Sequence, residues 1–549
     1  MAASMQNSEI FNPKFAANYE SEDIEGVFAK DFGPKTTDTD ILKLLDVFTN
    51  AQDMIFSSSD SIMKFVRNQL KTQKAATQYS KIQLIHAYRY LLKKEQIVRN
   101  TSLEKFIKLK STRGNSGILQ ITSMMSGQLF GVDSPENIKR GGCPHNCVYC
   151  PLEIVDGVVT QPRSYLSKEP ANQRAAQNKH HPLGQIFDCL QRFDKMGHLS
   201  PEPTNPAKIE FMISGGTFNF FPKDYIIWFT TISYYAMNIY YDYMMFGLDG
   251  VRQPLSLEEE QRINETADIR MIGFTVETRP DYLITSDDIY EVVRFFRYLG
   301  ITRVQIGTQH TDDAILRKVK RDCTNAENKE AGKILMDNGF KTDKHWMPGL
   351  PETTPDIDKK MIDEIFSDPD HDADDIKIYP TSVVEYSQLA DWYNSGEYVP
   401  YAELDDGKHM IDVITYFLMK IPYTMRVNRV IRDFYVDAMI GGTTDGGMRN
   451  AIEENLKNMH VRLKDIRVRE VKNGEFDPND CHLFVDEYPS CGGINYFISY
   501  ENLARTKLYG FIRLRFNKST KYTMPELIDH ALVRELHVYG SHTGVGSTN

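Results

Sequence analysis

Short apolar runs of strand character alternate with helical stretches through the middle of the chain. The strand-like runs occupy residues 117–122, 208–213, 269–276, 302–307, 341–347 and 374–379. Helix-like stretches lie between them, for example at 286–300 and 325–339. This alternation predicts parallel βαβ units. Six units predict a partial or complete α/β barrel, whose functional residues lie at the carboxyl ends of its strands.

The pattern changes on both sides of this region. Residues 1–75 are polar with helical stretches near 38–50 and 60–72, and a basic helical segment continues to about 110. A helix is expected at 405–420. Beyond it, strand-like runs follow at 466–471, 481–487, 494–500, 507–516 and 532–540. Consecutive strands with alternating polarity predict an antiparallel sheet in a second domain.

Composition places the 549-residue chain among soluble globular proteins, since 41% of its residues are apolar and 25% are charged. No apolar run approaches the roughly 18 residues that a membrane-spanning helix needs. The N-terminus lacks the basic and then apolar pattern of a secretory signal. We therefore expect a cytoplasmic protein, with the nucleus as an alternative, and no membrane partner.

The net charge of −11 hides a basic segment between Lys81 and Arg113. Nine Lys or Arg residues stand there against two Glu residues, with aromatic residues interleaved. A basic face is the electrostatic footprint of phosphate-backbone binding. The alternative is the solvent-exposed side of an amphipathic helix.

Three of the seven cysteines fall within eight positions, as Cys143-x3-Cys147-x2-Cys150 in a Gly- and Pro-rich loop. Three thiolates bind three irons of a 4Fe-4S cubane and leave the fourth iron open to another ligand. A zinc site with His145 as fourth ligand is an open alternative, although four-cysteine zinc sites usually come as two separated pairs. Chance grouping of structural cysteines is the third interpretation.

Other candidate residues follow the later strands. Gly215 and Gly216 end the run at 208–213, where a glycine pair allows close backbone approach to a ligand. Charged and amide side chains that end or flank strands are expected at the same barrel mouth; they are Glu277, Arg279, Gln305, Gln309 and Lys377. Plain turns and solvated loops are the alternatives at these positions.

The chain resembles the Elongator catalytic subunit family, the tRNA uridine(34) acetyltransferases, which join a radical S-adenosylmethionine (SAM) domain to a GNAT-type acetyltransferase domain. The resemblance rests on ordered segments that include CPHNCVYCP, SYLSKEPANQRA, KIEFMISGGTF, IGFTVETRPDY, RVQIGTQ and VRELHVYG. It implies an α/β fold, with a partial TIM-type radical SAM barrel followed by an incomplete GNAT-type α+β domain. The expected domains are a helical, basic, tRNA-binding region (1–115), the barrel (116–400), a helical linker (401–460) and the incomplete GNAT domain (461–549).

The resemblance also implies the cofactors and the roles of the site residues. Cys143, Cys147 and Cys150 would hold a 4Fe-4S cluster, and SAM and acetyl-CoA would be the other cofactors. The expected catalytic residues are Lys208, Glu277 and Tyr500. The expected cofactor-binding residues are Lys208, Gly215, Gly216, Glu277, Gln309, Glu535, Leu536, His537 and Val538. The expected partner is the tRNA anticodon loop with its wobble uridine, contacted by the basic segment and by Arg426, Arg429 and Arg432. Other Elongator-like subunits or a second copy of the chain are further candidate partners.

The implied reaction forms 5-carboxymethyluridine at the wobble position. A radical derived from SAM would remove hydrogen from the acetyl-CoA methyl group, and the resulting carbon would join C5 of the uridine. Two alternatives stay open: a radical SAM tRNA-binding protein that has lost acetyl-CoA chemistry, and a non-catalytic tRNA-binding scaffold subunit.

The sequence departs from the family pattern at several positions. The first two cysteines are closer together than is usual in the family, and Pro151-Leu152-Glu153 replaces Pro-Gly-Gly. Gln305 stands where the family usually has Glu, which removes one charge from the barrel mouth. The last residues, Gly540–Asn549, contain Gly544-Val-Gly546 but not the family's pyrophosphate loop and its helix, so we expect the GNAT part to be incomplete.

Overall fold

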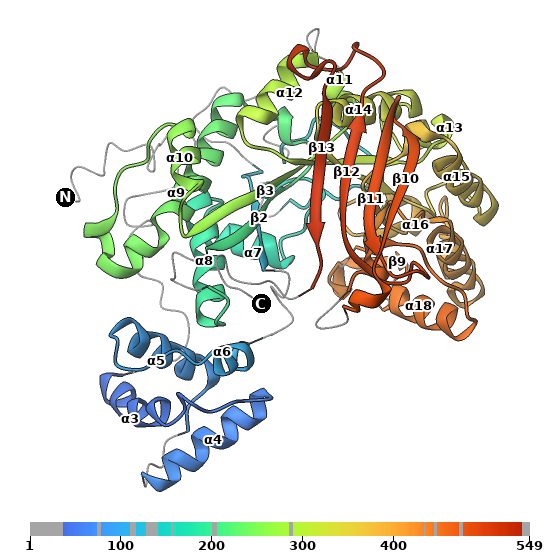
Figure 1. Cartoon of the computed structure of the whole chain (residues 1–549). Helices are drawn as coiled ribbons and strands as arrows, with labels where there is room; N and C mark the ends of the chain where they lie inside the picture. Colours follow the sequence, from blue (N-terminus) through green and yellow to red (C-terminus); the bar gives the residue numbers. More distant parts are fainter. Residues whose placement is uncertain are drawn as a thin grey trace.

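The computed structural model describes most of the chain between residues 37 and 540 (Figure 1). The described ranges are 37–73, 78–109, 117–127, 141–154, 161–199, 206–284, 289–432, 434–443, 447–471 and 476–540, with Gly157 and Val159. Gly544-Val-Gly546 lies outside them. No helix within these ranges is long and apolar enough to cross a bilayer.

The central element is a seven-stranded, wholly parallel sheet with the order β1-β2-β3-β4-β5-β6-β8. Its strands are β1 (Ile118–Met124), β2 (Ala207–Ser214), β3 (Ile269–Thr278), β4 (Arg303–Gln309), β5 (Lys341–Trp346), β6 (Asp375–Ile378) and β8 (Arg426–Val430). The six strands expected from the sequence are all present. Because all seven strands run parallel, their carboxyl ends lie on the same side of the sheet, which forms the mouth of the barrel.

Helices flank this sheet. They are α7 (Pro170–Gln177), α8 (Pro182–Lys195), α9 (Lys223–Phe246), α10 (Leu257–Asn264), α11 (Asp281–Ile284), α12 (Ile289–Tyr298), α13 (Asp313–Lys318), α14 (Asn325–Asp337), α15 (Pro355–Ser367), α16 (Gln388–Ser395), α17 (Lys408–Lys420) and α18 (Met448–Asn458). The apolar residues of β2 alternate, so that Ile209, Phe211 and Ile213 pack under α8 and α9. The other positions hold Lys208, Glu210, Met212 and Ser214, which face the barrel interior and are polar except for Met212.

The expected helical linker at 401–460 was wrong in part. It contains α17 and α18, but it also contains β8, the last strand of the barrel sheet. It further contains β9 (Met439–Gly442), which pairs with β7 (Ser382–Val384). The barrel sheet therefore extends beyond residue 400. The short run RVNRV lacks the continuous apolar character by which buried parallel strands are recognised.

A second, antiparallel sheet has the order β10-β11-β12-β13. Its strands are β10 (His482–Ser490), β11 (Gly493–Glu501), β12 (Leu508–Phe516) and β13 (Ala531–Val538). The strand expected at 466–471 was wrong, because residues Ile466–Arg469 form the short helix α19. Asp465 caps this helix by accepting the Arg467 N–H, and such a cap favours a helical turn over an extended chain.

Buried charges join the second sheet to the barrel, close to the amino ends of its strands. Arg515 is fully buried and pairs with Asp337 at the end of α14. Arg513 and Arg534 both reach Asp374, just before β6. Charges buried in this way need their partners, so the two sheets are held in one fixed arrangement.

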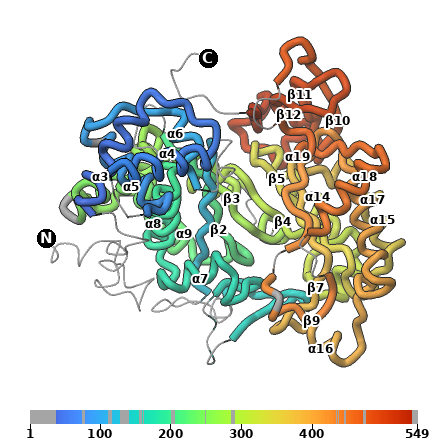
Figure 2. The backbone as a smooth tube through the Cα atoms, turned by 90° about the horizontal axis from the view of Figure 1, so that it is seen from below, coloured from blue at the N-terminus to red at the C-terminus, as the bar shows by residue number. Residues whose placement is uncertain are grey.

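The N-terminal helices form a separate small bundle with its own apolar core. They are α3 (Asp38–Thr49), α4 (Ser59–Thr72), α5 (Lys81–Lys93) and α6 (Thr101–Ile107). Capping boxes begin α3, α4 and α5, which accounts for their sharp starts. The bundle lies beside α8 (Figure 2), where Arg89 pairs with Asp194.

Candidate functional site

The cysteine loop follows β1 and lies at the mouth of the barrel. Cys143 and Cys147 are buried, Cys150 is half-buried, and all three are free thiols. The loop is held on two sides, because the Val148 N–H donates to the Val319 carbonyl at 3.0 Å and the Val148 carbonyl accepts from the Leu389 N–H at 2.8 Å.

Two glycines give the loop its shape. Gly141 and Gly142 have φ values of +90° and +69°, a region that other L-residues rarely adopt. A Cβ atom on Gly142 would lie 2.1 Å from the Phe221 ring, and one on Gly141 would lie 2.6 Å from the Arg163 backbone nitrogen. The chain can therefore approach the first cysteine only through residues without side chains.

Donor groups surround the three sulfurs. The Thr217 hydroxyl donates to Cys143 Sγ at 3.3 Å, and Arg279 and Arg321 each direct an Nη1 atom at Cys147 Sγ. Burial raises the pKa of the Cys150 thiol to about 11, and the charges of Cys147 and Cys143 add to this rise. The three thiols therefore influence one another, and a multivalent positive group would stabilise all three as thiolates.

The donor set fits an iron–sulfur cluster better than a single metal ion. Within the described ranges, no three His, Cys, Asp or Glu side chains are gathered closely enough to hold one ion. A cubane does not require this, because its three thiolates bind three different irons. The zinc alternative loses its fourth ligand, because His145 Nδ1 lies 3.2 Å from Asp322 Oδ2 and Nε2 lies 3.6 Å from Asp281.

Glu277 lies at the carboxyl end of β3, beside the glycine pair. Its carboxylate accepts the Tyr165 hydroxyl at 3.0 Å and the Gly215 N–H at 3.2 Å. Burial, and then the charge of Glu277, raise the pKa of Tyr165 well above its ordinary value, so the phenol keeps its proton and donates. The Arg432 guanidinium lies 4.7 Å from the Tyr165 ring centroid. The structure thus brings Gly215, Gly216 and Glu277 together, and adds Tyr165, which the sequence pattern did not single out.

Gln309 ends β4 at the same mouth, with φ of +70°. A Cβ atom on Gly307 would lie 2.6 Å from Gln309 Nε2 and 2.9 Å from Arg321 Nη2, so Gly307 leaves space for both side chains. Gln305 lies deeper and accepts from Nζ of the half-buried Lys377 at 2.6 Å. All the predicted strand-end residues therefore belong to the mouth or to the interior below it.

The barrel interior is lined by polar side chains rather than by an apolar core. On β5 these are Lys341, Asp343 and His345, at alternating positions. Burial raises the pKa of Asp343 to about 6, and burial together with Lys377 lowers the pKa of His345 well below its ordinary value. Asp343 Oδ1 and His345 Nε2 lie 4.0 Å apart, and neither has a hydrogen-bond partner among the described residues. Alternating polar residues in a parallel strand were the sequence signal for this interior.

The residues expected to bind acetyl-CoA lie at the opposite, amino end of the barrel. Lys208 is exposed at the start of β2, on the same face as Glu210, which pairs with Arg303 at 2.6 Å. Glu535 on β13 pairs with Lys341 at 2.5 Å and with Arg513 at 2.9 Å. Burial favours the neutral acid, but these cations hold the pKa of Glu535 far below its usual range.

The strand β13 presents alternating faces. His537 faces inward with Glu535, and its ring centroid lies 4.3 Å from that of Tyr539. Leu536 and Val538 face outward and are 72% and 77% exposed. Because β13 is the last strand of its sheet, its backbone edge has no neighbouring strand among the described residues.

Tyr500 lies apart from the other two residues expected to be catalytic. It pairs with Gly510, which in turn pairs with Val538, so the Tyr500 side chain shares the outer face of the sheet. It is 53% exposed, whereas Glu277 lies at the barrel mouth and Lys208 at the amino end. The structure therefore separates Lys208, Glu277 and Tyr500 into three places.

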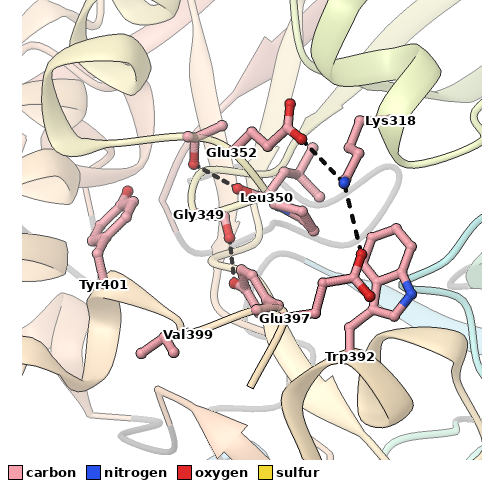
Figure 3. Close-up of a pocket in the computed structure, with 11 residues that line it drawn as sticks. Lys318, Gly349, Leu350, Glu352, Trp392, Glu397, Val399 and Tyr401 are labelled. Atoms are coloured by element: carbon pink, nitrogen blue, oxygen red, sulfur yellow. Dashed lines mark hydrogen bonds and ion pairs between the residues drawn. The ribbon is translucent and has the colours of Figure 1, made fainter. Parts of the chain in front are cut away.

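A cavity of about 250 Å³ lies next to the cysteine loop (Figure 3). Leu350 and Trp392 line it and also pack against Val148 and Tyr149 of the loop. Lys318 lies between the carboxylates of Glu352 and Glu397, at 3.1 and 3.7 Å from them. The charge of Lys318 is thus already paired, and two residues that line the cavity also pack against the loop.

Some of the basic residues expected to contact tRNA form internal ion pairs, and others are exposed. Arg432 pairs with Glu169, and Arg426 donates to Glu470 at 2.6 Å, so both guanidinium groups are mostly buried in internal contacts and are not open phosphate ligands. In the N-terminal bundle, Lys94 and Lys105 are exposed. Lys110 and Arg113 lie outside the described ranges.

The sequence of the chain matches two known protein-family models. Residues 138–365 match the Radical SAM superfamily, and residues 373–458 match the Radical_SAM C-terminal domain. The chain is therefore a radical SAM protein, a class that implies SAM and a 4Fe-4S cluster. The second match also covers β8, in agreement with a barrel that extends past residue 400.

Individual relatives narrow the assignment. The chain is 34% identical over 442 residues to tRNA uridine(34) acetyltransferase from Methanocaldococcus jannaschii, covering 79% of this chain and 74% of that protein. It is 27% identical over 533 residues to Elongator complex protein 3 from Saccharomyces cerevisiae, covering 93% and 87%. The structure of Methanocaldococcus infernus Elp3 with an N-terminal deletion matches with a TM-score of 0.61 and 29% identity, covering 77% of this chain and 84% of that one. The chain belongs to the tRNA uridine(34) acetyltransferase family.

Proposed function

We propose that this protein forms 5-carboxymethyluridine at the wobble position of tRNA from acetyl-CoA and SAM. The observation that carries the proposal is the buried cysteine triad beside Glu277 at the barrel mouth, in a chain 34% identical to a named tRNA uridine(34) acetyltransferase. When bound, the cluster and SAM supply the chemistry that joins the acetyl methyl carbon to C5 of the uridine, with one hydrogen removed from each carbon and the thioester then hydrolysed by water.

The residues at the mouth hold and orient the reactants. Gly215 and Gly216 allow the backbone to approach the amino and carboxylate groups of SAM. The Glu277 carboxylate, fixed by the Tyr165 hydroxyl and the Gly215 N–H, accepts hydrogen bonds from the same ligand. Gln309 adds an amide at the neighbouring strand end. Burial of these groups strengthens each polar contact and excludes water from the radical chemistry.

The amino end of the barrel is our candidate region for acetyl-CoA. Lys208 is an exposed cation there, suited to the phosphates of CoA. The free backbone edge of β13, which carries Glu535, Leu536, His537 and Val538, suits strand-like pairing with the amide groups of pantetheine. The wobble uridine must leave its stack to react, and the exposed bases of an anticodon loop are accessible in this way.

The test is transfer of labelled carbon. Anaerobically reconstituted protein is incubated with tRNA, SAM, a reductant and acetyl-CoA carrying ¹³C in its methyl group, and the nucleosides are analysed by mass spectrometry. We expect ¹³C-labelled 5-carboxymethyluridine from the native protein. Lys208→Ala should lose the label but still cleave SAM, whereas Lys223→Ala, which removes a lysine paired with Glu291 on the surface, should keep both activities. Absence of label from the native protein would overturn the proposal.

A second candidate is a radical SAM enzyme that acts on tRNA without acetyl-CoA. The observation that favours it is the exposure of Leu536 and Val538 on β13. Isothermal calorimetry with acetyl-CoA separates the two functions, because saturable binding excludes the second candidate and absence of binding excludes the first.

A further inference from the structure

Two buried guanidinium groups converge on one sulfur of the cysteine loop. Arg279 Nη1 lies 3.6 Å from Cys147 Sγ, and Arg321 Nη1 lies 3.8 Å from the same atom. Arg279 is 2% exposed and Arg321 is 6% exposed. Arg279 pairs with the buried Asp281 carboxylate, whereas Arg321 donates to the Gly307 carbonyl and to this sulfur, so a compensating role is expected above all of the Arg321 charge.

Both side chains are fixed in place by other contacts. Arg279 Nε donates to Asp281 Oδ1 at 3.0 Å, and its Nη2 donates to the Arg321 carbonyl. Arg321 Nη2 donates to the carbonyl of Gly307 at 2.5 Å. Each guanidinium group therefore directs only its Nη1 atom at the sulfur. The hydrogen bonds of the other nitrogens fix this orientation.

The surroundings of the cysteines are unequal. Cys147 receives these two cationic donors, whereas Cys143 receives the neutral Thr217 hydroxyl at 3.3 Å. Hydrogen bonds and positive charge at cluster sulfurs stabilise the more negative, reduced cluster, and burial strengthens the effect because screening is weak there. The iron bound by Cys147 would thus be the most favoured site for the added electron.

We propose that Arg279 and Arg321 are positioning residues that raise the reduction potential of the cluster through Cys147. The proposal rests on the cluster assigned to Cys143, Cys147 and Cys150, and it is independent of acetyl-CoA and tRNA. The step concerned is the uptake of one electron by the oxidised cluster from an external reductant such as dithionite, with no bond formed or broken. Without the two cations the same reductant would reduce a smaller share of the protein.

The experiment is an anaerobic redox titration of the reconstituted protein, followed by electron paramagnetic resonance of the reduced cluster. Arg321→Gln should shift the ratio of reduced to oxidised cluster at least tenfold toward the oxidised form, which is about 59 mV for a one-electron couple. Arg321→Lys should recover part of the shift, because it restores the charge. Thr217→Val removes the neutral donor at Cys143 and should produce a smaller change than Arg321→Gln.

Iron content and visible absorbance show whether each variant carries a full cluster. Equal potentials in the native protein and in a fully loaded Arg321→Gln variant would overturn the proposal. If that variant does not assemble the cluster, Arg279→Gln is titrated instead, because it removes the other cationic donor at Cys147, and an unchanged potential there overturns the proposal. Loss of the cluster in both variants also overturns it, because the arginines would then serve assembly. Failure of the labelled-carbon experiment leaves these potentials unaffected, so the two proposals fail separately.

Discussion

The Tyr165 hydroxyl donates to the Glu277 carboxylate at 3.0 Å, across the barrel mouth from the end of the cysteine loop to the end of β3. The two residues are 112 positions apart in the chain. Their contact joins the loop to the strand that we expect to bind SAM, so the orientation of Glu277 depends on a residue outside its own strand.

Tyr165→Phe should weaken SAM binding about tenfold, because a hydrogen bond to a charged group contributes about 1.5 kcal/mol or more. Iron content should stay at the native level, because Tyr165 does not contact a cysteine sulfur. Equilibrium binding of SAM to the reconstituted protein measures the change. Native affinity in this variant would show that Tyr165 does not orient Glu277.

Gly142→Ala should prevent cluster assembly. The new Cβ atom would lie 2.1 Å from the Phe221 ring at a φ of +69°. Gly157→Ala is the matched control, because Gly157 has a φ of +77° but no atom of the described residues lies within 4 Å of the position that a Cβ would occupy. Both variants therefore carry a similar backbone penalty of roughly 1–2 kcal/mol for an L-residue in the left-handed region, and only the first carries the clash. Iron per chain after reconstitution distinguishes them, and equal iron in the two variants would contradict this account of the loop.

Arg515→Ala should destabilise the junction between the two sheets. Arg515 is fully buried and pairs with Asp337, and removal of one partner from a buried pair costs roughly 3–5 kcal/mol. The control is Arg294→Ala, which removes an exposed pair between Arg294 and Glu526 and should change stability little. Denaturant midpoints measure the difference, and similar midpoints for the two variants would argue against a fixed junction.

Because of His180, the free energy of unfolding should fall as the pH is lowered below about 6.5. Burial lowers the pKa of His180 in the folded protein to about 4 from 6.5, so the unfolded chain binds the proton more readily. The neutral form therefore contributes its full stability above pH 6.5, and this contribution is lost as the pH falls from 6.5 to about 4. His180→Asn removes the titrating group and keeps a residue that tolerates the φ of +58° found there.

Midpoints of urea unfolding at pH 7 and pH 5 test this prediction. The native protein should lose more stability between the two pH values than His180→Asn does. Parallel losses in both proteins would assign the pH dependence to other groups.

The sequence predicts the architecture well where each segment carries its own signal. The six expected barrel strands are short runs of strand character between helical stretches, and they are all present. The strand β8 was missed because it is only five residues long and lies within the region predicted to be a linker, although its Asn428 side chain donates to Asp343 in the barrel interior. The helix at Ile466–Arg469 resembles a strand in sequence because apolar and basic residues alternate, but the structure buries Ile466 and Arg469, exposes Val468, and caps the helical turn with Asp465.

The candidate site was predictable in part for the same reason. Cys143, Cys147 and Cys150 are neighbours in sequence, so their spacing alone identifies them. Tyr165 contacts Glu277, and Arg321 contacts Cys147, each across a long separation in the sequence. Local sequence patterns do not predict contacts of this kind. The expected tRNA contacts Arg426 and Arg432 were misplaced because charge in a sequence does not distinguish an exposed cation from a buried ion pair.

Reductive cleavage of SAM by the reconstituted protein tests the central claim most directly. Under dithionite the native protein should release 5′-deoxyadenosine and methionine, and Cys147→Ser should lose both iron and this activity. A native protein that carries a full cluster yet leaves SAM intact, or a Cys147→Ser variant that cleaves SAM at the native rate, would contradict the assignment of the cysteine loop as the radical site.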